Sequence, residues 1–206
     1  MVCGSSVTPS NVVVSNLTTD ITKTVAGCFT TLRQLRSVRR SLSRDAFTRL
    51  VVAIVLSRLD YCNGVRAGLP ASQLNRLQSV LHASARMIYG ARRHDHVKPL
   101  LQRLHWLSVP ERVEFKLRLL HGLGLDYLSS DFVSVSDLRS RQKRRSATTA
   151  ALVVAVTRHS TLGDRAFHVI AAMLWNALPG DITSATSLLT FRHKLKTFLF
   201  RRSYNA

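Results

Sequence analysis

Acidic residues are scarce in this sequence. Nine Asp and two Glu stand against 30 Lys and Arg, which gives a formal net charge of +19. The Asp residues are scattered singly, and no Asp-Asp pair occurs. Polymerase-type phosphoryl transfer needs two metal ions held by clustered carboxylates. The sequence therefore gives no support for metal-dependent polymerisation by this chain alone, and it predicts no enzymatic activity.

Cysteine is also sparse. Cys3, Cys28 and Cys62 are widely spaced and form no Cys-x-x-Cys pair, so neither a zinc knuckle nor a disulfide framework is indicated. This usage favours a reducing compartment, the nucleus or the cytoplasm. His94 and His96 are two positions apart, whereas helical metal ligands usually lie four apart. We interpret them as polar turn residues and predict no metal site.

Several sequence signatures are missing altogether. There is no Gly-x-Ser-x-Gly elbow, no Gly-x-x-x-x-Gly-Lys phosphate loop and no Gly-x-Gly-x-x-Gly motif, so no cofactor is predicted. The longest apolar run, Leu50 to Leu56, is far shorter than the roughly 20 residues of a membrane span. The N-terminus lacks the basic start and apolar core of a signal peptide. We therefore expect no membrane insertion.

Arginine is abundant and supplies 24 of the 30 cations. Its planar fork matches phosphate oxygens, and a strongly basic globule repels itself unless a polyanion screens it. Nucleic acid is the first partner to consider, and an anionic membrane surface is the second. Cations at a helix end also complement the helix dipole, which explains one or two of them. Five arginines within twelve positions, from Arg33 to Arg44, favour phosphate contacts instead.

The candidate nucleic-acid-binding residues lie in three stretches of the chain. They are Arg33, Arg36, Arg40, Arg44, Arg92, Arg93, Arg139, Arg141, Lys143, Arg144 and Arg145. Phe and Tyr do not interleave with these residues, so base stacking is not indicated. The predicted contacts are to the sugar-phosphate backbone.

Hydrophobic periodicity predicts an all-α fold, an irregular bundle of about six helices with a basic flexible linker and at most a short strand pair. Residues 1–16 are expected to be an irregular lead-in and residues 17–125 a helical region. Residues 126–151 are rich in Ser and Arg and are interpreted as a basic linker. Residues 152–206 form a predicted C-terminal helical segment, with a strand-like run at its start, from Leu152 to Val156.

Helix boundaries follow from capping residues. The first helix is expected to begin near Thr18, Thr19 or Asp20, and the second at Ser43. The second is apolar nearly all round, which predicts deep burial. A third helix runs from Pro70 to a C-terminal cap at Gly90. Later helices are expected over residues 96–107, from Ser108 to about Gly122, after Asp164, and from Ser187.

The apolar run of the second helix, Leu50 to Leu56, is followed by Arg58, Asp60, Tyr61 and Cys62. These residue types are catalytic in many enzymes. On the helical wheel of this helix, Tyr61 and Cys62 fall on the same side as Phe47 and Ile54, so we predict that they are buried and finish a core helix. Arg58 also falls on the apolar side. It either turns outward at the helix end or, if buried, pairs with a carboxylate.

Four short motifs, SRLDYCN, LHWLSVPER, GDRAF and LWNALP, occur in this order. Together with their surroundings, over residues 17–202, they resemble the C-terminal part of non-LTR retrotransposon reverse transcriptases, the LINE type of the CR1 and Jockey groups. The resemblance implies the thumb region and the segment after it. A thumb grips RNA template and growing DNA by backbone and shape. The metal-binding palm and the fingers would precede this region in the parent protein and are possible protein partners.

These observations lead to one main hypothesis, a non-catalytic, nucleic-acid-binding remnant of an RNA-directed DNA polymerase that binds RNA or an RNA–DNA hybrid. A first alternative is a transposon-derived reading frame with no evolved function. A second is that reverse transcriptase activity belongs to the full-length parent protein only. The stretch GDRAFHVIAAMLWNALP departs from relatives, which tend to carry prolines there. This departure suits a decayed or domesticated insertion.

Overall fold

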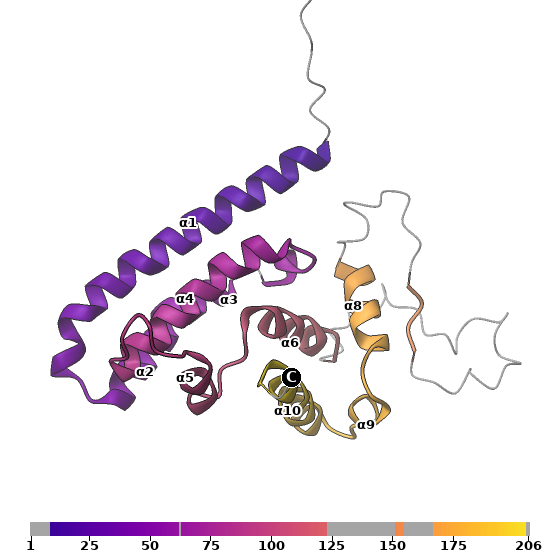
Figure 1. Cartoon of the computed structure of the whole chain (residues 1–206). Helices are drawn as coiled ribbons and strands as arrows, with labels where there is room; N and C mark the ends of the chain where they lie inside the picture. Colours follow the sequence, from indigo (N-terminus) through magenta and orange to yellow (C-terminus); the bar gives the residue numbers. More distant parts are fainter. Residues whose placement is uncertain (1–8, 62, 123–150, 155–166, 205–206) are drawn as a thin grey trace, which may run out of the picture. The chain divides into compact units, whose positions relative to one another are not determined.

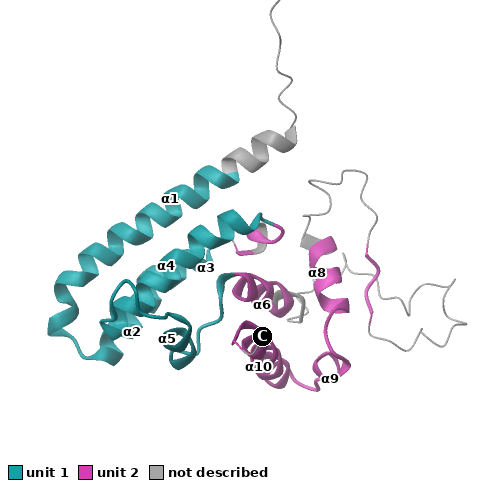
Figure 2. Ribbon diagram, viewed as in Figure 1, with its two compact units in different colours: residues 1–61, 69–109 teal, residues 62–68, 110–206 magenta. Residues whose placement is uncertain are grey.

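The computed structural model describes residues 9–61, 63–122, 151–154 and 167–204. The predicted all-α fold is confirmed, because every regular element in these ranges is a helix and none is a strand (Figure 1). The predicted basic linker lies almost entirely outside them. The chain divides into two compact units (Figure 2). Unit 1 comprises residues 1–61 and 69–109, and unit 2 comprises residues 62–68 and 110–206.

Unit 1 begins with a long helix, α1 (Pro9–Val38). The prediction of an irregular lead-in is therefore wrong for residues 9–16, which are helical, and the helix starts well before Asp20. Once a helix has formed, each added residue gains a hydrogen bond, so its first turns need no apolar stripe. The buried side chains of α1 recur at helical spacing and are Ile21, Cys28, Thr31, Leu32 and Leu35.

The second helix of unit 1 has three parts, α2 (Arg44–Val51), the π-helical turn η2 (Val52–Leu56) and α3 (Ser57–Asp60). The predicted start is confirmed, because the Ala46 N–H donates to the Ser43 side chain at 3.3 Å. Its buried residues are Phe47, Val51, Val55, Leu56 and Leu59.

Two expectations for this helix are wrong. The π turn places an extra residue in one helical turn, so the helical side chains after it are rotated relative to a regular wheel. Tyr61, predicted to be buried, is 73% exposed, and it lies just beyond the end of α3 with an extended backbone. Val52 and Ala53 are also exposed, so the helix is not buried all round. Cys62 lies outside the described residues.

Arg58 turns outward, which was one of the two alternatives for this residue. It is exposed, and its Nη1 donates to Thr31 Oγ1 of α1 at 3.0 Å. On the same side of α1, the buried Cys28 thiol lies 4.0 Å from the carbonyl oxygen of Val55. Both contacts tie the second helix to α1, so this stretch has a structural role.

Helix α4 (Ala71–Tyr89) packs against α1 and α2. Its predicted limits are confirmed: Pro70 precedes it, and Gly90 caps its C-terminus in the left-handed conformation at φ +68°. The 3-10 turn η1 (Arg39–Ser41) joins α1 to α2, and α5 (Lys98–Arg103) packs on α4. The core side chains of α4 are Leu77, Val80, Leu81, Ser84, Ala85 and Ile88.

Gly90 is required by both its conformation and its surroundings. A Cβ at this position would lie 2.5 Å from Nη2 of Arg39, in a backbone conformation that L side chains rarely adopt. We expect Gly90→Ala to lower the free energy of unfolding by about 1 kcal/mol, because of the left-handed backbone. Gly27→Ala, in the middle of α1, is the matched control. A Cβ there makes an ordinary contact of 3.9 Å with Arg58, so urea denaturation should show no loss, and equal losses in both variants would contradict the argument.

Unit 2 contains the 3-10 turn η3 (Asn63–Arg66) and the helices α6 (Val109–Gly122), α8 (Phe167–Asn176), α9 (Gly180–Thr183) and α10 (Leu188–Tyr204). The predicted starts after Ser108 and Ser187 are confirmed, and the Ser187 hydroxyl accepts from the Thr190 N–H at 3.1 Å. The predicted cap at Asp164 lies outside the described residues. One core joins α6 and α8 and consists of Ala67, Val113 and Leu117 with Ile170 and Leu174.

The predicted strand-like run from Leu152 is not a strand over residues 152–154, and its last two residues lie outside the described ranges. Leu152 has only an isolated bridge, and its backbone groups also bond to a side chain. Its N–H donates to Asn176 Oδ1 at 2.8 Å, and its carbonyl accepts from Asn176 Nδ2 at 2.9 Å. One amide side chain thus satisfies both backbone groups, as a neighbouring strand would have done.

Candidate nucleic-acid interface

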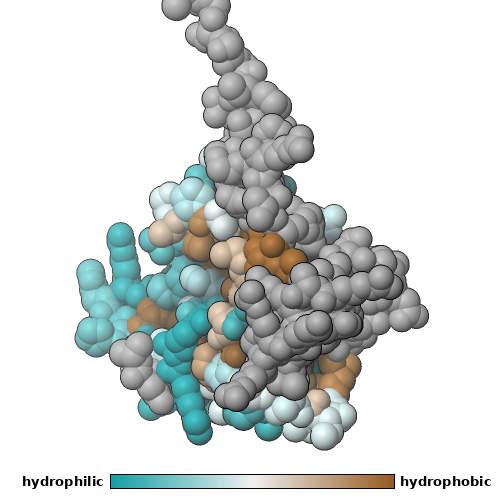
Figure 3. Space-filling model, turned by 90° about the vertical axis from the view of Figure 1, so that its right-hand side faces the viewer, coloured by the Kyte–Doolittle hydropathy of each residue, from teal (hydrophilic) through white to brown (hydrophobic). Residues whose placement is uncertain are grey.

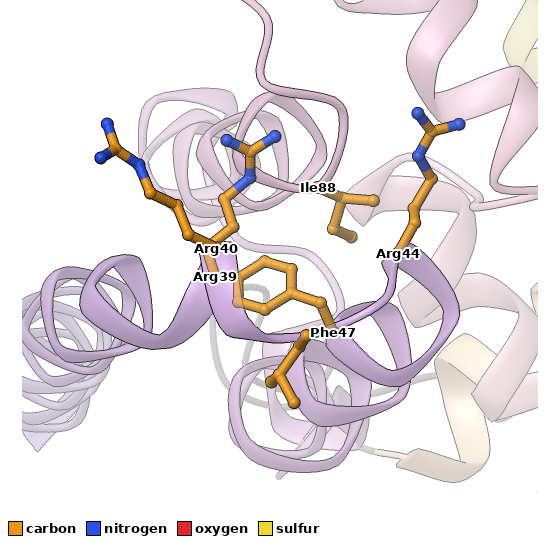
Figure 4. A pocket seen from close by; sticks show the side chains of 6 residues that line it. Arg39, Arg40, Arg44, Phe47 and Ile88 are labelled. Carbon is orange, nitrogen blue, oxygen red and sulfur yellow. The ribbon is translucent and has the colours of Figure 1, made fainter.

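Six arginines of unit 1 surround two adjoining hollows. The larger hollow, of about 660 Å³, is lined by five of them and by Gly90. The smaller, of about 270 Å³, is shown in Figure 4, where Phe47 and Ile88 lie between the arginine side chains. None of the residues that line either hollow is acidic. We call this set the arginine cluster: Arg36, Arg39, Arg40, Arg44, Arg86 and Arg93.

The packing of α1 on α4 assembles the cluster. The last turn of α1 and the turn η1 supply Arg36, Arg39 and Arg40. The last turn of α4 supplies Arg86, and the loop after Gly90 supplies Arg93. Cations are stabilised at helix C-termini by the partial negative charge there. Two such ends lie side by side here, so one hollow collects the cations of both helices.

The cluster has an exposed rim and two half-buried members, Arg39 and Arg86. Arg86 Nη2 donates to the backbone carbonyl of Asp95 at 3.3 Å. Its Nε is buried and has no hydrogen-bond partner among the described residues. Arg44 lies over the ring of Tyr89, with its guanidinium carbon 5.3 Å from the ring centroid, a cation–π contact that orients this side chain.

No carboxylate neutralises the cluster within the part of the chain that the structure describes. Asp95 lies in the loop after α4, and its carboxylate accepts a hydrogen bond of 2.6 Å from the backbone N–H of Arg92. Clustered cations that have no ion-pair partner create a positive local potential, which attracts anions and raises the rate at which they associate. The hollows are therefore suited to bind phosphate groups.

Four of the predicted binding residues belong to the cluster, namely Arg36, Arg40, Arg44 and Arg93. Arg33 and Arg92 are exposed but line neither hollow. The remaining five lie outside the described residues: Arg139, Arg141, Lys143, Arg144 and Arg145. Arg86 was not predicted to contact phosphate, and Arg39 was counted in the run from Arg33 to Arg44 but was not one of the eleven candidates. Arg39 belongs to the same run of arginines, whereas nothing in the sequence near Arg86 indicates that it faces α1.

Unit 2 holds a second charged group, where α6 meets α10. Glu114 forms ion pairs with Arg118 and Arg202, and Arg202 Nε also lies 3.8 Å from Glu111. Burial lowers the pKa of Arg118, and Glu114 partly offsets that effect. The hydrogen bond with Glu114 raises the pKa of Arg202. Because the carboxylates neutralise these two arginines, the group is suited to hold α6 and α10 together.

Burial next to Glu111 also raises the pKa of Tyr204 to about 12. The neutral phenol is thus favoured in the folded state, so this contribution to stability is present below pH 10 and is lost as the pH rises towards 12. We expect a phenolate transition near pH 12 in an absorbance titration, missing in Tyr204→Phe. An unchanged titration curve in that variant would contradict the assignment.

The described residues contain no group of three or more His, Cys, Asp or Glu that could hold a metal ion, and His94 and His96 are both exposed. Among the described helices, none combines the length and the apolar character needed to cross a membrane.

Comparison with known proteins gave no match to a family model, to a curated protein or to a solved structure.

Proposed function

We propose that this chain binds RNA or an RNA–DNA hybrid through the arginine cluster, by contacts to backbone phosphates. It would do so as a non-catalytic remnant of a retrotransposon-encoded RNA-directed DNA polymerase, in the nucleus or the cytoplasm. The observation that carries the proposal is the gathering of six arginines from two helix ends and their flanking segments around hollows that no carboxylate lines. The order of the four sequence motifs supports the polymerase origin.

The chemistry of the cluster favours phosphate over a protein carboxylate. Each guanidinium offers several N–H donors in a fixed plane, and phosphates present several oxygens in a row along a strand. Arg36, at the end of α1, and Arg40, in η1, are both exposed and four positions apart, which suits contacts to neighbouring phosphates. Contacts of this kind carry no base sequence, so the expected binding is independent of sequence.

The test is the affinity of the purified chain for an RNA–DNA hybrid at two salt concentrations, measured by fluorescence anisotropy. Each phosphate that is neutralised releases counter-ions, which gives a log–log slope of about −0.9 on duplex DNA. Six contacts predict a slope of roughly −5. A chain that shows the same negligible binding at both concentrations would rule the proposal out.

A transposon-derived reading frame with no evolved function is the second candidate. Figure 3 shows hydrophobic patches on the described surface, with hydrophilic residues between them. In unit 2, Met173 is 56% exposed and Leu189 is 66% exposed, as expected of helices that once packed on another part of a larger protein. Circular dichroism during heating separates the candidates, since a cooperative melt without aggregation counts against a chain with no evolved function.

A third candidate places reverse transcriptase activity in the full-length parent protein only. It agrees with the first in denying activity to the isolated chain, but it makes binding dependent on the palm and fingers. Primer extension with Mg²⁺ should yield no product with this chain alone. Binding that requires added palm and fingers would favour this third candidate.

A further inference from the structure

We propose that the larger hollow binds the terminal phosphate of a nucleic-acid strand. This inference rests on the proposed function and assigns one part of the ligand to one part of the cluster. The remaining arginines would contact internal phosphates of the same strand.

The first argument is the shape of the site. The hollow of about 660 Å³ has Arg39 and Arg86 as its half-buried members and Arg36, Arg40 and Arg93 as exposed ones. An internal phosphodiester carries a sugar on both sides, which keeps it at the rim of such a recess. A terminal phosphate is attached on one side only. It can therefore enter far enough to reach the two half-buried guanidinium groups.

The second argument is charge. Five arginines line the larger hollow, and no carboxylate lines it. An internal phosphodiester brings one negative charge. A phosphate monoester brings about −1.5 to −2 at pH 7 and three strong acceptor oxygens. The terminal group therefore offsets more of the mutual repulsion of the arginines and accepts more of their hydrogen bonds.

The third argument is an unused donor. The Nε of Arg86 is buried without a partner among the described residues, which costs free energy unless a ligand or an ordered water accepts from it. Gly90 contributes as well, because the absence of a Cβ leaves room for the guanidinium of Arg39 against the end of α4. Arg39, Arg86 and Gly90 all line the larger hollow.

The experiment compares one RNA of fixed sequence in three forms, with a 5′-phosphate, with a 3′-phosphate, or with hydroxyls at both ends. Binding is measured by anisotropy at one salt concentration, with an internal dye. We expect one phosphorylated form to bind roughly tenfold more tightly than the unphosphorylated form. The form that gains identifies which end is bound. Inorganic pyrophosphate should abolish the difference by competing for the hollow.

Paired variants locate the effect. Arg39→Gln with Arg86→Gln should remove the preference for a phosphorylated end and leave weaker, salt-dependent binding of all three RNAs. Arg49→Gln with Arg103→Gln removes two exposed charges of unit 1 that line neither hollow, and it should keep the preference. Arg39→Lys with Arg86→Lys keeps the positive charge but removes the planar guanidinium. This variant should keep only part of the preference for a phosphorylated end. Circular dichroism confirms that each variant is folded.

Failure of this inference differs from failure of the proposed function. Equal, salt-dependent affinity for the three RNAs would overturn the terminal-phosphate site and leave backbone binding in place. A preference that survives in Arg39→Gln with Arg86→Gln would also overturn it. Absence of binding to all three RNAs would overturn both proposals.

Discussion

Replacing Glu114 by Gln is expected to lower the free energy of unfolding of unit 2 by about 3 kcal/mol. Glu114 is the partner of Arg118, whose side chain is only 2% exposed. Nε and Nη1 of Arg118 already have no hydrogen-bond partner among the described residues. Removing the carboxylate charge leaves a buried cation without a counter-ion, and such a group costs more than the pair contributes. Urea denaturation, with hydrogen exchange of the amides of α6 and α10, measures the loss and assigns it to unit 2.

Two controls separate burial from charge. Arg202→Gln removes the other partner of Glu114, but Arg202 is 43% exposed, so we expect a loss below about 1 kcal/mol. Glu114→Leu combined with Arg118→Met replaces the pair by apolar side chains and should recover most of the stability. A Glu114→Gln variant as stable as the parent chain would show that Arg118 is solvated or paired in another way.

Removing three exposed members of the arginine cluster is expected to weaken binding to an RNA–DNA hybrid on the order of 100-fold. The variant combines Arg36→Gln, Arg40→Gln and Arg93→Gln. An exposed contact between arginine and phosphate contributes about 1 kcal/mol, and every 1.4 kcal/mol is a factor of ten. The log–log slope against salt should become less steep by about 0.9 for each phosphate that is no longer neutralised. Anisotropy titrations at four salt concentrations give both quantities.

The matched control again uses Arg49 and Arg103, which are exposed on unit 1 but line neither hollow. Replacing them by Gln removes charge from the same unit, so any effect of total charge appears there. We expect a change of affinity of about threefold or less, from long-range attraction alone. Similar losses per charge in control and cluster variants would indicate a diffuse basic surface without a specific site.

Many helix ends of this fold could be predicted from local sequence signals. Ser43, Pro70 and Gly90 act within one turn of the chain, through capping, a preset φ and a left-handed cap, so a single sequence was enough to place these helix ends. Features that depend on neighbours within one helix were therefore predictable.

Other features depend on packing and gave no local signal. Val52 to Leu56 is uniformly apolar, so nothing in it indicates the extra residue of a π turn. The wheel also continued through Tyr61, whereas the helix ends at Asp60 and Tyr61 is exposed. Arg86 is one arginine on an otherwise ordinary helix. Its place in the cluster follows only from the packing of α4 against the end of α1.

The most direct measurement of the central claim is the protection of arginines from phenylglyoxal when the chain binds an RNA–DNA hybrid. Modified residues are identified by mass spectrometry, with and without the hybrid, at low salt. The account predicts protection of the exposed members of the cluster, above all Arg36, Arg40 and Arg93, with Arg49 and Arg103 modified equally in both samples. If the hybrid binds but none of the three cluster residues is modified less than in the free chain, the proposed binding site is contradicted.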